Sequence, residues 1–151
     1  MSRTHSSRLV ALGAAACFLA MGTPGAAMVH DGRSYAIEAA IPELDRKQNP
    51  FTLRHTWWNG ELEPGKSRVI RHQLFKGNEY WFWAGCSELS AKIVIHIYDS
   101  EGKRVEAESW KRGHVAGARI VPSRTASYLI RVTLREAEDP PAEWAVIYGF
   151  R

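Results

Sequence analysis

The sequence is poor in cysteine, with two among its 151 residues. One of them, Cys17, lies in an N-terminal stretch that we expect to be removed, which leaves Cys86 alone. A single cysteine forms no intramolecular disulfide, so about 124 residues must fold by burying a hydrophobic core, which this length permits. We therefore expect Cys86 to be a small buried residue rather than a reactive thiol. Pairing of Cys86 between two chains is left open.

A hydrophobic run long enough to span a membrane is also missing. The longest one, Leu9 to Met21, has 13 residues, whereas a transmembrane helix needs roughly 20. This run follows two arginines and precedes the small residues of "GTPGAA", an arrangement typical of a secretory signal peptide. We expect residues 1–27 to be the signal peptide, cleaved between Ala27 and Met28, and the product to be secreted or periplasmic.

Lipidation at Cys17 is the alternative reading of this leader. Lipoprotein signals place a Leu-like residue three positions before the cysteine, at the end of the apolar run. Here that position is Ala14, and the run continues beyond Cys17 through Met21. The signal peptide is therefore the better prediction.

A strong excess of either charge is absent as well. The chain has 20 basic and 16 acidic residues, and the leader holds Arg3, Arg8 and no acid, so the remaining chain has a net charge of +2. The basic residues are scattered along the sequence. This charge gives no electrostatic reason to expect a nucleic-acid partner.

Motifs that carry chemistry are missing too. The sequence has no G-x-S-x-G nucleophile turn and no glycine-rich loop for phosphate. Closely spaced histidine pairs, typical of metal sites, are absent, and His55, His72 and His96 could meet only across strands. We therefore expect a non-catalytic protein without a cofactor. A metal-assisted hydrolase that uses these three histidines is the alternative.

What the sequence does contain, from residue 51 onward, is a series of short strand patterns. About eight of them are separated by turn signals such as "NGELEPG", "KGN" and "DSEG". Their even spacing predicts an all-β fold, an antiparallel β-sandwich or jelly roll over residues 51–151.

Residues 28–50 have a different pattern, with good helix formers. Ile37, Ile41 and Leu44 are spaced as one helical face. Pro42 interrupts this helix or begins a second short one. We expect a short helical segment that caps the sandwich.

Alternation along the strands predicts which side chains face the core. In "KIVIHIY" the three isoleucines point inward, whereas Val94, His96 and Tyr98 point outward with the lysine. In "ASYLIRVTL" the inward set begins at Tyr128, and Arg131 faces outward. In the last strand Trp144, Val146 and Tyr148 form one set.

The stretch "NEYWFWAGC" has more aromatic residues than one buried face needs. Tyr80, Phe82 and Ala84 belong to the inward set, so Trp81 and Trp83 should face outward. Three accounts remain open: the helical segment covers these tryptophans, they bind a partner protein, or they stack against sugar rings of a glycan polymer.

Three further residues complete the predicted ligand or partner surface. Trp57 and Trp58 are adjacent on a strand, so one faces the core and the other does not; Trp58 is a candidate. The outward residues His96 and Tyr98 are the other two. An envelope protein or a glycan polymer is the expected partner of the candidates Trp81, Trp83, Trp58, His96 and Tyr98. The oligomeric state is left open.

The order of these motifs resembles the bacterial pre-peptidase C-terminal domains and their stand-alone secreted relatives. "LFKGNEYWFWAGCSE" is similar to their L-x-x-G-x-x-Y-x-F-x-A-x-C stretch. "IVIHIYDSEGKRV" is similar to their D-L-x-L-x-L-Y-D-x-x-G-x-x-V strand and turn, and "VPSRTASYLIRVTL" to their T-G-x-Y-x-V-x-V strand. The resemblance covers roughly residues 61–150.

This resemblance implies a jelly-roll-like sandwich that acts as a non-catalytic accessory or binding module in secreted proteins. Some relatives bind calcium, but this chain has Ala91 and Lys92 where family members often carry acids. Asp99 and Glu101 alone supply too few carboxylates, so we expect a hairpin turn there and no calcium. A purely structural envelope protein, with every tryptophan covered, is the remaining alternative.

Overall fold

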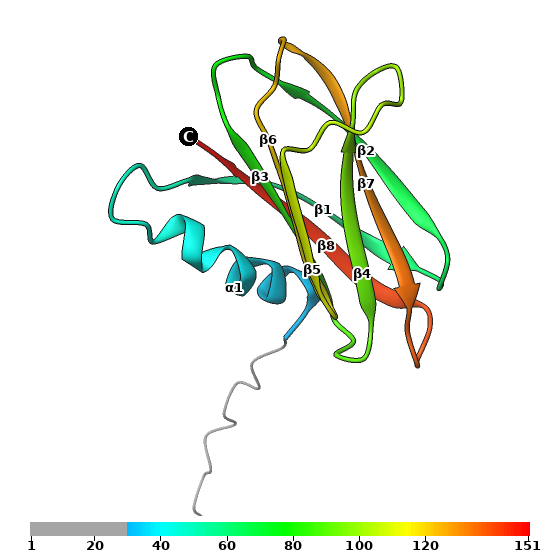
Figure 1. Ribbon diagram of the computed structural model, residues 1–151. Helices are drawn as coiled ribbons and strands as arrows, with labels where there is room; N and C mark the ends of the chain where they lie inside the picture. The colour runs from blue at the N-terminus through cyan, green and yellow to red at the C-terminus, as the bar shows by residue number, and fades with distance from the viewer. Residues whose placement is uncertain (1–29) are drawn as a thin grey trace, which may run out of the picture.

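The computed structural model of the protein describes residues 30–151 (Figure 1). Over this range the chain forms one helix followed by eight strands. They are α1 (Gly32–Leu44), β1 (Thr52–Leu62), β2 (Ser67–Leu74), β3 (Tyr80–Cys86), β4 (Lys92–Tyr98), β5 (Glu108–Arg112), β6 (Val115–Ile120), β7 (Ala126–Glu136) and β8 (Ala142–Phe150).

The strands form two sheets in which every pairing is antiparallel. The larger sheet has the order β1-β8-β3-β6-β5, and the smaller has the order β2-β7-β4. The predicted all-β antiparallel sandwich with a short N-terminal helix is confirmed. The predicted signal peptide and Cys17 lie outside the described residues. In the part of the chain that the structure describes, no helix has the length and apolarity to cross a membrane.

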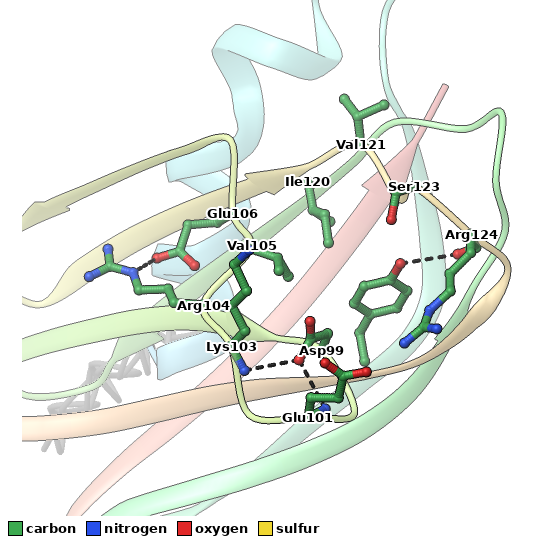
Figure 2. A pocket seen from close by; sticks show the side chains of 11 residues that line it. Asp99, Glu101, Lys103, Arg104, Val105, Glu106, Ile120, Val121, Ser123 and Arg124 are labelled. Carbon is green, nitrogen blue, oxygen red and sulfur yellow. Dashed lines mark hydrogen bonds and ion pairs between the residues drawn. The ribbon is translucent and has the colours of Figure 1, made fainter.

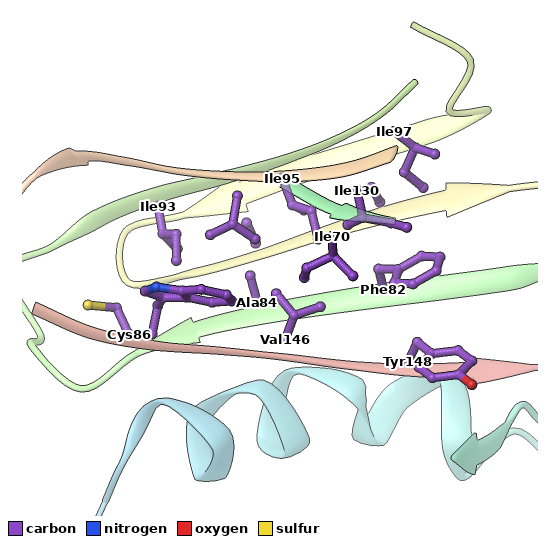
Figure 3. Close-up of a cluster of buried hydrophobic side chains, with 14 of the residues drawn as sticks. Ile70, Phe82, Ala84, Cys86, Ile93, Ile95, Ile97, Ile130, Val146 and Tyr148 are labelled. Atoms are coloured by element: carbon purple, nitrogen blue, oxygen red, sulfur yellow. The ribbon is translucent and has the colours of Figure 1, made fainter. Parts of the chain in front are cut away.

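The main core lies between the two sheets (Figure 3). Isoleucines of β4 and β7 point toward aromatic and small side chains of β3 and β8. The alternation predicted for these strands is confirmed, because Tyr80, Phe82 and Ala84 join this cluster together with Trp144 and Tyr148. Each large buried side chain stabilises the fold by roughly 1.5–3 kcal/mol, so this layer holds the two sheets together.

Helix α1 packs on the outer face of the five-stranded sheet (Figure 1). It begins at an N-cap, Asp31, whose carboxylate accepts the Ser34 N–H at 2.8 Å. This hydrogen bond lowers the pKa of Asp31, as expected for a capping carboxylate at a helix N-terminus. The helix therefore begins at Gly32, directly after this cap, and it packs on the sheet from there.

Two glycines let the helix backbone approach the sheet backbone. A Cβ on Gly85 of β3 would lie 2.1 Å from the Gly32 carbonyl oxygen and 2.7 Å from the Ala36 nitrogen. A Cβ on Gly32 would lie 2.7 Å from the Gly85 carbonyl oxygen. These distances are too short for any side chain, so the contact requires glycine at both positions.

The close approach also decides which helical residues are buried. Ala36 and Ala40 face the sheet and have no exposed surface, with Ile37 and Leu44 beside them. Ile41, which the predicted face included, is 46% exposed. That part of the prediction is wrong, because the contact is centred on small residues rather than on the large apolar ones.

Pro42 neither interrupts the helix nor starts a second one. It lies in the last turn of α1, which ends when the Asp45 N–H bonds to the Ile41 carbonyl. A proline this close to the C-terminal end removes only one backbone hydrogen bond. The helix therefore continues through it to Leu44.

Cys86 is buried in the main core, as predicted. Burial raises the pKa of its thiol, which keeps the sulfur in its unreactive protonated form. Since this side chain has no exposed surface, the folded domain offers no sulfur to a second chain.

Candidate functional site

Trp81 and Trp83 do point away from the main core, but α1 covers them. Their exposed fractions are 3% and 0%. The two indoles stack with centroids 6.0 Å apart, and Phe51 meets Trp83 edge-on at 6.4 Å. They form a second core with Ala36, Ala40, Phe51 and Ile147. The account in which these rings bind a partner or a sugar is therefore wrong, and the account in which the helix covers them is correct.

The edge of this second core is closed by an ion-pair network. Glu79 bonds to Arg119 at 2.6 Å and to Arg151 at 2.8 Å. Burial raises the pKa of Glu79, but the two guanidinium groups outweigh it and leave the pKa below its usual value. Arg151 also lies 4.4 Å from the Phe51 ring centroid. Apolar side chains thus fill the space between α1 and the sheet, and the ion pairs of Glu79 cover its edge.

Trp58 lies at the seam between β1 and β2, on the opposite face of the sheet from the covered tryptophans. It packs against the main core, edge-on to His72 at 5.2 Å and tilted against Tyr148 at 5.6 Å. Its neighbour Trp57 is more exposed and lies under Arg33, at 5.0 Å. The prediction that one of this pair faces the core is confirmed.

The histidines of the hydrolase alternative do not come together. His72 faces inward and contacts Tyr148 at 4.7 Å, whereas His96 lies on the outer face of the same sheet. Burial lowers the pKa of His72, and the charge of Arg54 lowers it further. Among residues 30–151, no three His, Cys, Asp or Glu side chains are grouped to hold a metal ion. His55, His72 and His96 therefore do not form one site.

His96 and Tyr98 lie on the outer face of the three-stranded sheet, which α1 does not cover (Figure 1). Cross-strand register places His96 opposite Arg131, and Tyr98 opposite Leu129, with β2 on the far side of β7. The outward positions are Ser67, Val69, Arg71 and Gln73 on β2, Ser127, Leu129, Arg131, Thr133 and Arg135 on β7, and Lys92, Val94, His96 and Tyr98 on β4. None of them is acidic, but two carboxylates lie along the β4 edge of the face: Glu136 pairs with Lys92, and Glu106 lies beside His96.

Arg131 is held in place at the centre of this face. Its Nε donates to Ser67 Oγ at 3.2 Å, and Ser67 Oγ lies 2.7 Å from Thr133 Oγ1. Within residues 30–151, Arg71, Arg131 and Arg135 form no ion pair. Since the guanidinium groups are exposed and lack carboxylate partners, the face carries uncompensated positive charge.

Glu106 caps the β4 edge of this sheet, a role that was not predicted from the sequence. Its carboxylate accepts the Ile97 N–H at 3.2 Å, lies 3.0 Å from His96 Nδ1 and pairs with Arg104. The side chain is only 3% exposed. The Ile97 N–H faces away from β7, so it would otherwise be free to bond to another strand. The Glu106 carboxylate accepts this hydrogen bond instead, which prevents edge-to-edge pairing at this position.

The ionisation of Glu106 follows from those contacts. Burial raises the pKa of this carboxyl, but hydrogen bonds from its own backbone, Arg104, Ile97 and His96 outweigh burial, so the pKa lies below its usual value. The carboxylate is therefore charged at neutral pH and balances Arg104. The sequence offered only a weak signal for it, an acid in a returning strand ten positions after a histidine.

A hollow of about 650 Å³ lies between the loop after β4 and the loop after β6 (Figure 2). One Asp99 oxygen accepts the N–H groups of Glu101 and Lys103, both at 2.9 Å. Tyr128 donates its hydroxyl proton to the Arg124 carbonyl at 3.1 Å. Asp99 is therefore the cap of a hairpin turn, and a rim with charges of both signs favours no ligand of one charge.

A smaller hollow, about 150 Å³, opens at the seam between β1 and β2. Its aromatic walls come from Tyr80, Tyr148, Phe150 and the half-exposed Phe75. Its polar lining residues are Arg54, His72, Gln73 and Asn78. No sequence pattern predicts this group, because its members come from four strands and one loop.

Comparison of the sequence with known protein families and with curated proteins finds no match. The resemblance to pre-peptidase C-terminal domains stays a prediction. The candidate site is therefore defined by geometry: an uncovered, arginine-bearing sheet face that includes the predicted His96 and Tyr98. It excludes Trp81 and Trp83, and also the predicted Trp58, which packs against the main core.

Proposed function

We propose that this domain is a non-catalytic binding module of a secreted or periplasmic protein, and that it binds a linear anionic glycan polymer. The polymer lies on the outer face of the three-stranded sheet. The observation that carries this proposal is the composition of that face, which has three exposed arginines without carboxylate partners, whereas the two carboxylates at its β4 edge, Glu106 and Glu136, are paired with Arg104 and Lys92.

The arrangement of the arginines favours an extended ligand. Arg71 and Arg131 are diagonal neighbours on adjacent strands, because Arg71 pairs with Leu129. Arg135 follows Arg131 by four positions, which is about 13 Å along a strand. The cations therefore form a line rather than a compact cluster, as a polymer with carboxylate groups at intervals requires.

The uncharged residues between the arginines suit sugar rings. Tyr98 is partly exposed and Val69 is 57% exposed, and Leu129 lies between their strands. Apolar and aromatic surfaces contact the C–H faces of sugars, while guanidinium groups bind carboxylates through paired hydrogen bonds. The face thus offers both kinds of contact in one plane.

The test is a calorimetric titration of the mature domain with alginate oligomers, which are linear polyuronates, and with neutral dextran. Wild-type protein should bind alginate and not dextran. Arg71→Glu/Arg131→Glu should weaken alginate binding by about tenfold or more, since roughly 1.4 kcal/mol corresponds to tenfold in affinity.

The matched control is Arg33→Glu/Lys47→Glu, which makes the same change in net charge on the helix side. This variant should keep most of the affinity. An equal loss in both variants would mean non-specific charge attraction and would overturn the proposal. Tighter binding of polyglutamate than of alginate would replace the glycan with an acidic protein partner.

A further inference from the structure

We propose that the hollow between β1 and β2 binds a single acidic sugar ring, with a uronic acid as the matching chemistry. The inference rests on the proposed function for the source of that ring, the end of the anionic polymer. It concerns a different set of residues, which line the seam of the sandwich rather than its outer face.

The size of the hollow sets the size of the ligand. About 150 Å³ is room for roughly five water molecules, and it is below the usual range for drug-sized ligands. One six-membered ring fits this space, whereas a longer oligosaccharide must continue outside it. The site therefore suits a terminal residue or one ring of a chain.

The walls of the hollow suit the apolar face of such a ring. Tyr148 and Phe150 come from β8, and Tyr80 lies 6.2 Å from Phe150 between ring centroids. Phe75 stands at the rim with 51% of its surface exposed, so its ring is available to a ligand in the hollow. These rings provide the flat apolar contacts that sugars form in protein sites.

A buried hydroxyl group gives the hollow a hydrogen-bond donor. The Tyr80 hydroxyl accepts the Phe75 N–H at 3.1 Å and the Asn78 side-chain amide at 3.0 Å. Both lone pairs are used, so its own proton is available, and Tyr80 is only 4% exposed. A sugar hydroxyl at this position would accept that proton.

The charge of the hollow selects an acidic ring. Arg54 lies 5.4 Å from the Phe150 ring centroid and has no carboxylate partner among residues 30–151. His72, with its lowered pKa, adds no positive charge at neutral pH. One uncompensated guanidinium group therefore matches one carboxylate.

Gln73 connects the hollow to the outer face. It lines the hollow and is also an outward residue of β2, two positions after Arg71. A chain that crosses the sheet beside Arg71 therefore reaches the hollow without leaving the protein surface. The two sites can bind one polymer at two points.

The test is an NMR titration of the mature domain with glucuronic acid, glucose and glutarate. Glucuronic acid should shift the signals of His72 and Tyr148 with a dissociation constant in the millimolar range, about 4 kcal/mol of binding free energy. Glucose should bind more weakly because it lacks the carboxylate, and glutarate because it lacks the ring.

Two variants locate the binding. Arg54→Gln should lower the affinity for glucuronic acid by about tenfold. Tyr80→Phe, which removes only a hydroxyl, should lower it several-fold. The matched control Lys47→Gln removes an exposed charge from the helix side, away from both proposed sites, and should leave the monosaccharide titration unchanged. The spectrum of each free variant shows whether it is folded.

The outcomes separate this inference from the proposed function. If alginate binds and glucuronic acid does not shift the hollow, the inference is wrong and the outer-face proposal stands. If glucuronic acid binds in the hollow but alginate does not bind, the inference about the hollow stands and the outer-face proposal is wrong. Equal binding of glutarate and glucuronic acid would overturn the sugar assignment, because the hollow would then recognise a carboxylate only.

Discussion

The two outer faces of the sandwich are built by the same alternation of side chains but have opposite surroundings. On the five-stranded sheet the outward residues include Trp81 and Trp83, and α1 buries them. On the three-stranded sheet the outward residues include Arg71, Arg131 and Arg135, and no helix covers them. An outward position on a strand is therefore exposed only where no other element of the fold covers it.

Stability and binding are therefore assigned to different faces. The outer face of the five-stranded sheet, which carries Trp81 and Trp83, stabilises the fold by burying apolar surface. The outer face of the three-stranded sheet, which we call the arginine face because it carries Arg71, Arg131 and Arg135, contributes little to stability, because exposed charges without partners have small effects. Substitutions on the two faces should separate these contributions.

The largest difference should come from truncating one central residue on each face. Trp83→Ala should lower the free energy of unfolding by about 3–5 kcal/mol, since it leaves a cavity under α1. Arg131→Ala should change it by less than about 0.5 kcal/mol. Urea unfolding followed by far-UV circular dichroism measures both. Similar losses in the two variants would contradict the division between the faces.

The next largest change in the free energy of unfolding should come from Gly85, which lies under the helix. Gly85→Ala should cost about 1–3 kcal/mol, because the new methyl group meets backbone atoms of Gly32 and Ala36 rather than movable side chains. Gly60→Ala is the matched control, since its Cβ would meet only the Trp144 side chain at 3.4 Å. The same urea experiment applies. A tolerated Gly85→Ala would mean that the helix is not held at backbone contact.

These glycines also show how far the sequence could predict the fold. The alternation placed Trp81 and Trp83 on the outer face correctly, because strand geometry is local. Their burial depends on Gly32 and Gly85, which are 53 positions apart in the sequence. No local pattern reveals that these two backbones touch, so coverage by the helix remained only one of three accounts.

The candidate site was predictable to a smaller extent. His96 and Tyr98 were placed on the outer face from the isoleucine alternation in their own strand. The seam hollow was not predicted, because it combines Arg54, His72 and Tyr148 from three strands whose meeting depends on tertiary packing. Glu106 was missed for the same reason, since its hydrogen bond to the Ile97 N–H exists only after β4 becomes an edge strand.

A smaller, pH-dependent effect should mark the edge of the arginine face. The pKa of Glu106 is lower in the folded protein than its ordinary value of 4.5, so its contribution to stability is complete above about pH 4.5 and disappears as the pH falls through the folded pKa. Glu106→Gln should therefore be less stable than wild type at pH 7, and this difference should shrink below pH 4.5.

Urea unfolding at a series of pH values tests this, with Glu101→Gln as the control at an exposed loop carboxylate. The control should follow the wild-type pH profile. A difference between wild type and Glu106→Gln that stays constant down to pH 2 would mean that the charge of this carboxylate does not stabilise the edge.

The measurement that tests the central assignment most directly is an amide NMR map of the uniformly labelled mature domain during titration with alginate oligomers. We expect the largest shifts on β2, β7 and β4 around Arg71, Arg131 and Tyr98, and none in α1 or the indole signals of Trp81 and Trp83. Shifts concentrated in α1 and those two indoles would show that the ligand enters through the helix side, and would contradict the assignment of binding to the uncovered face.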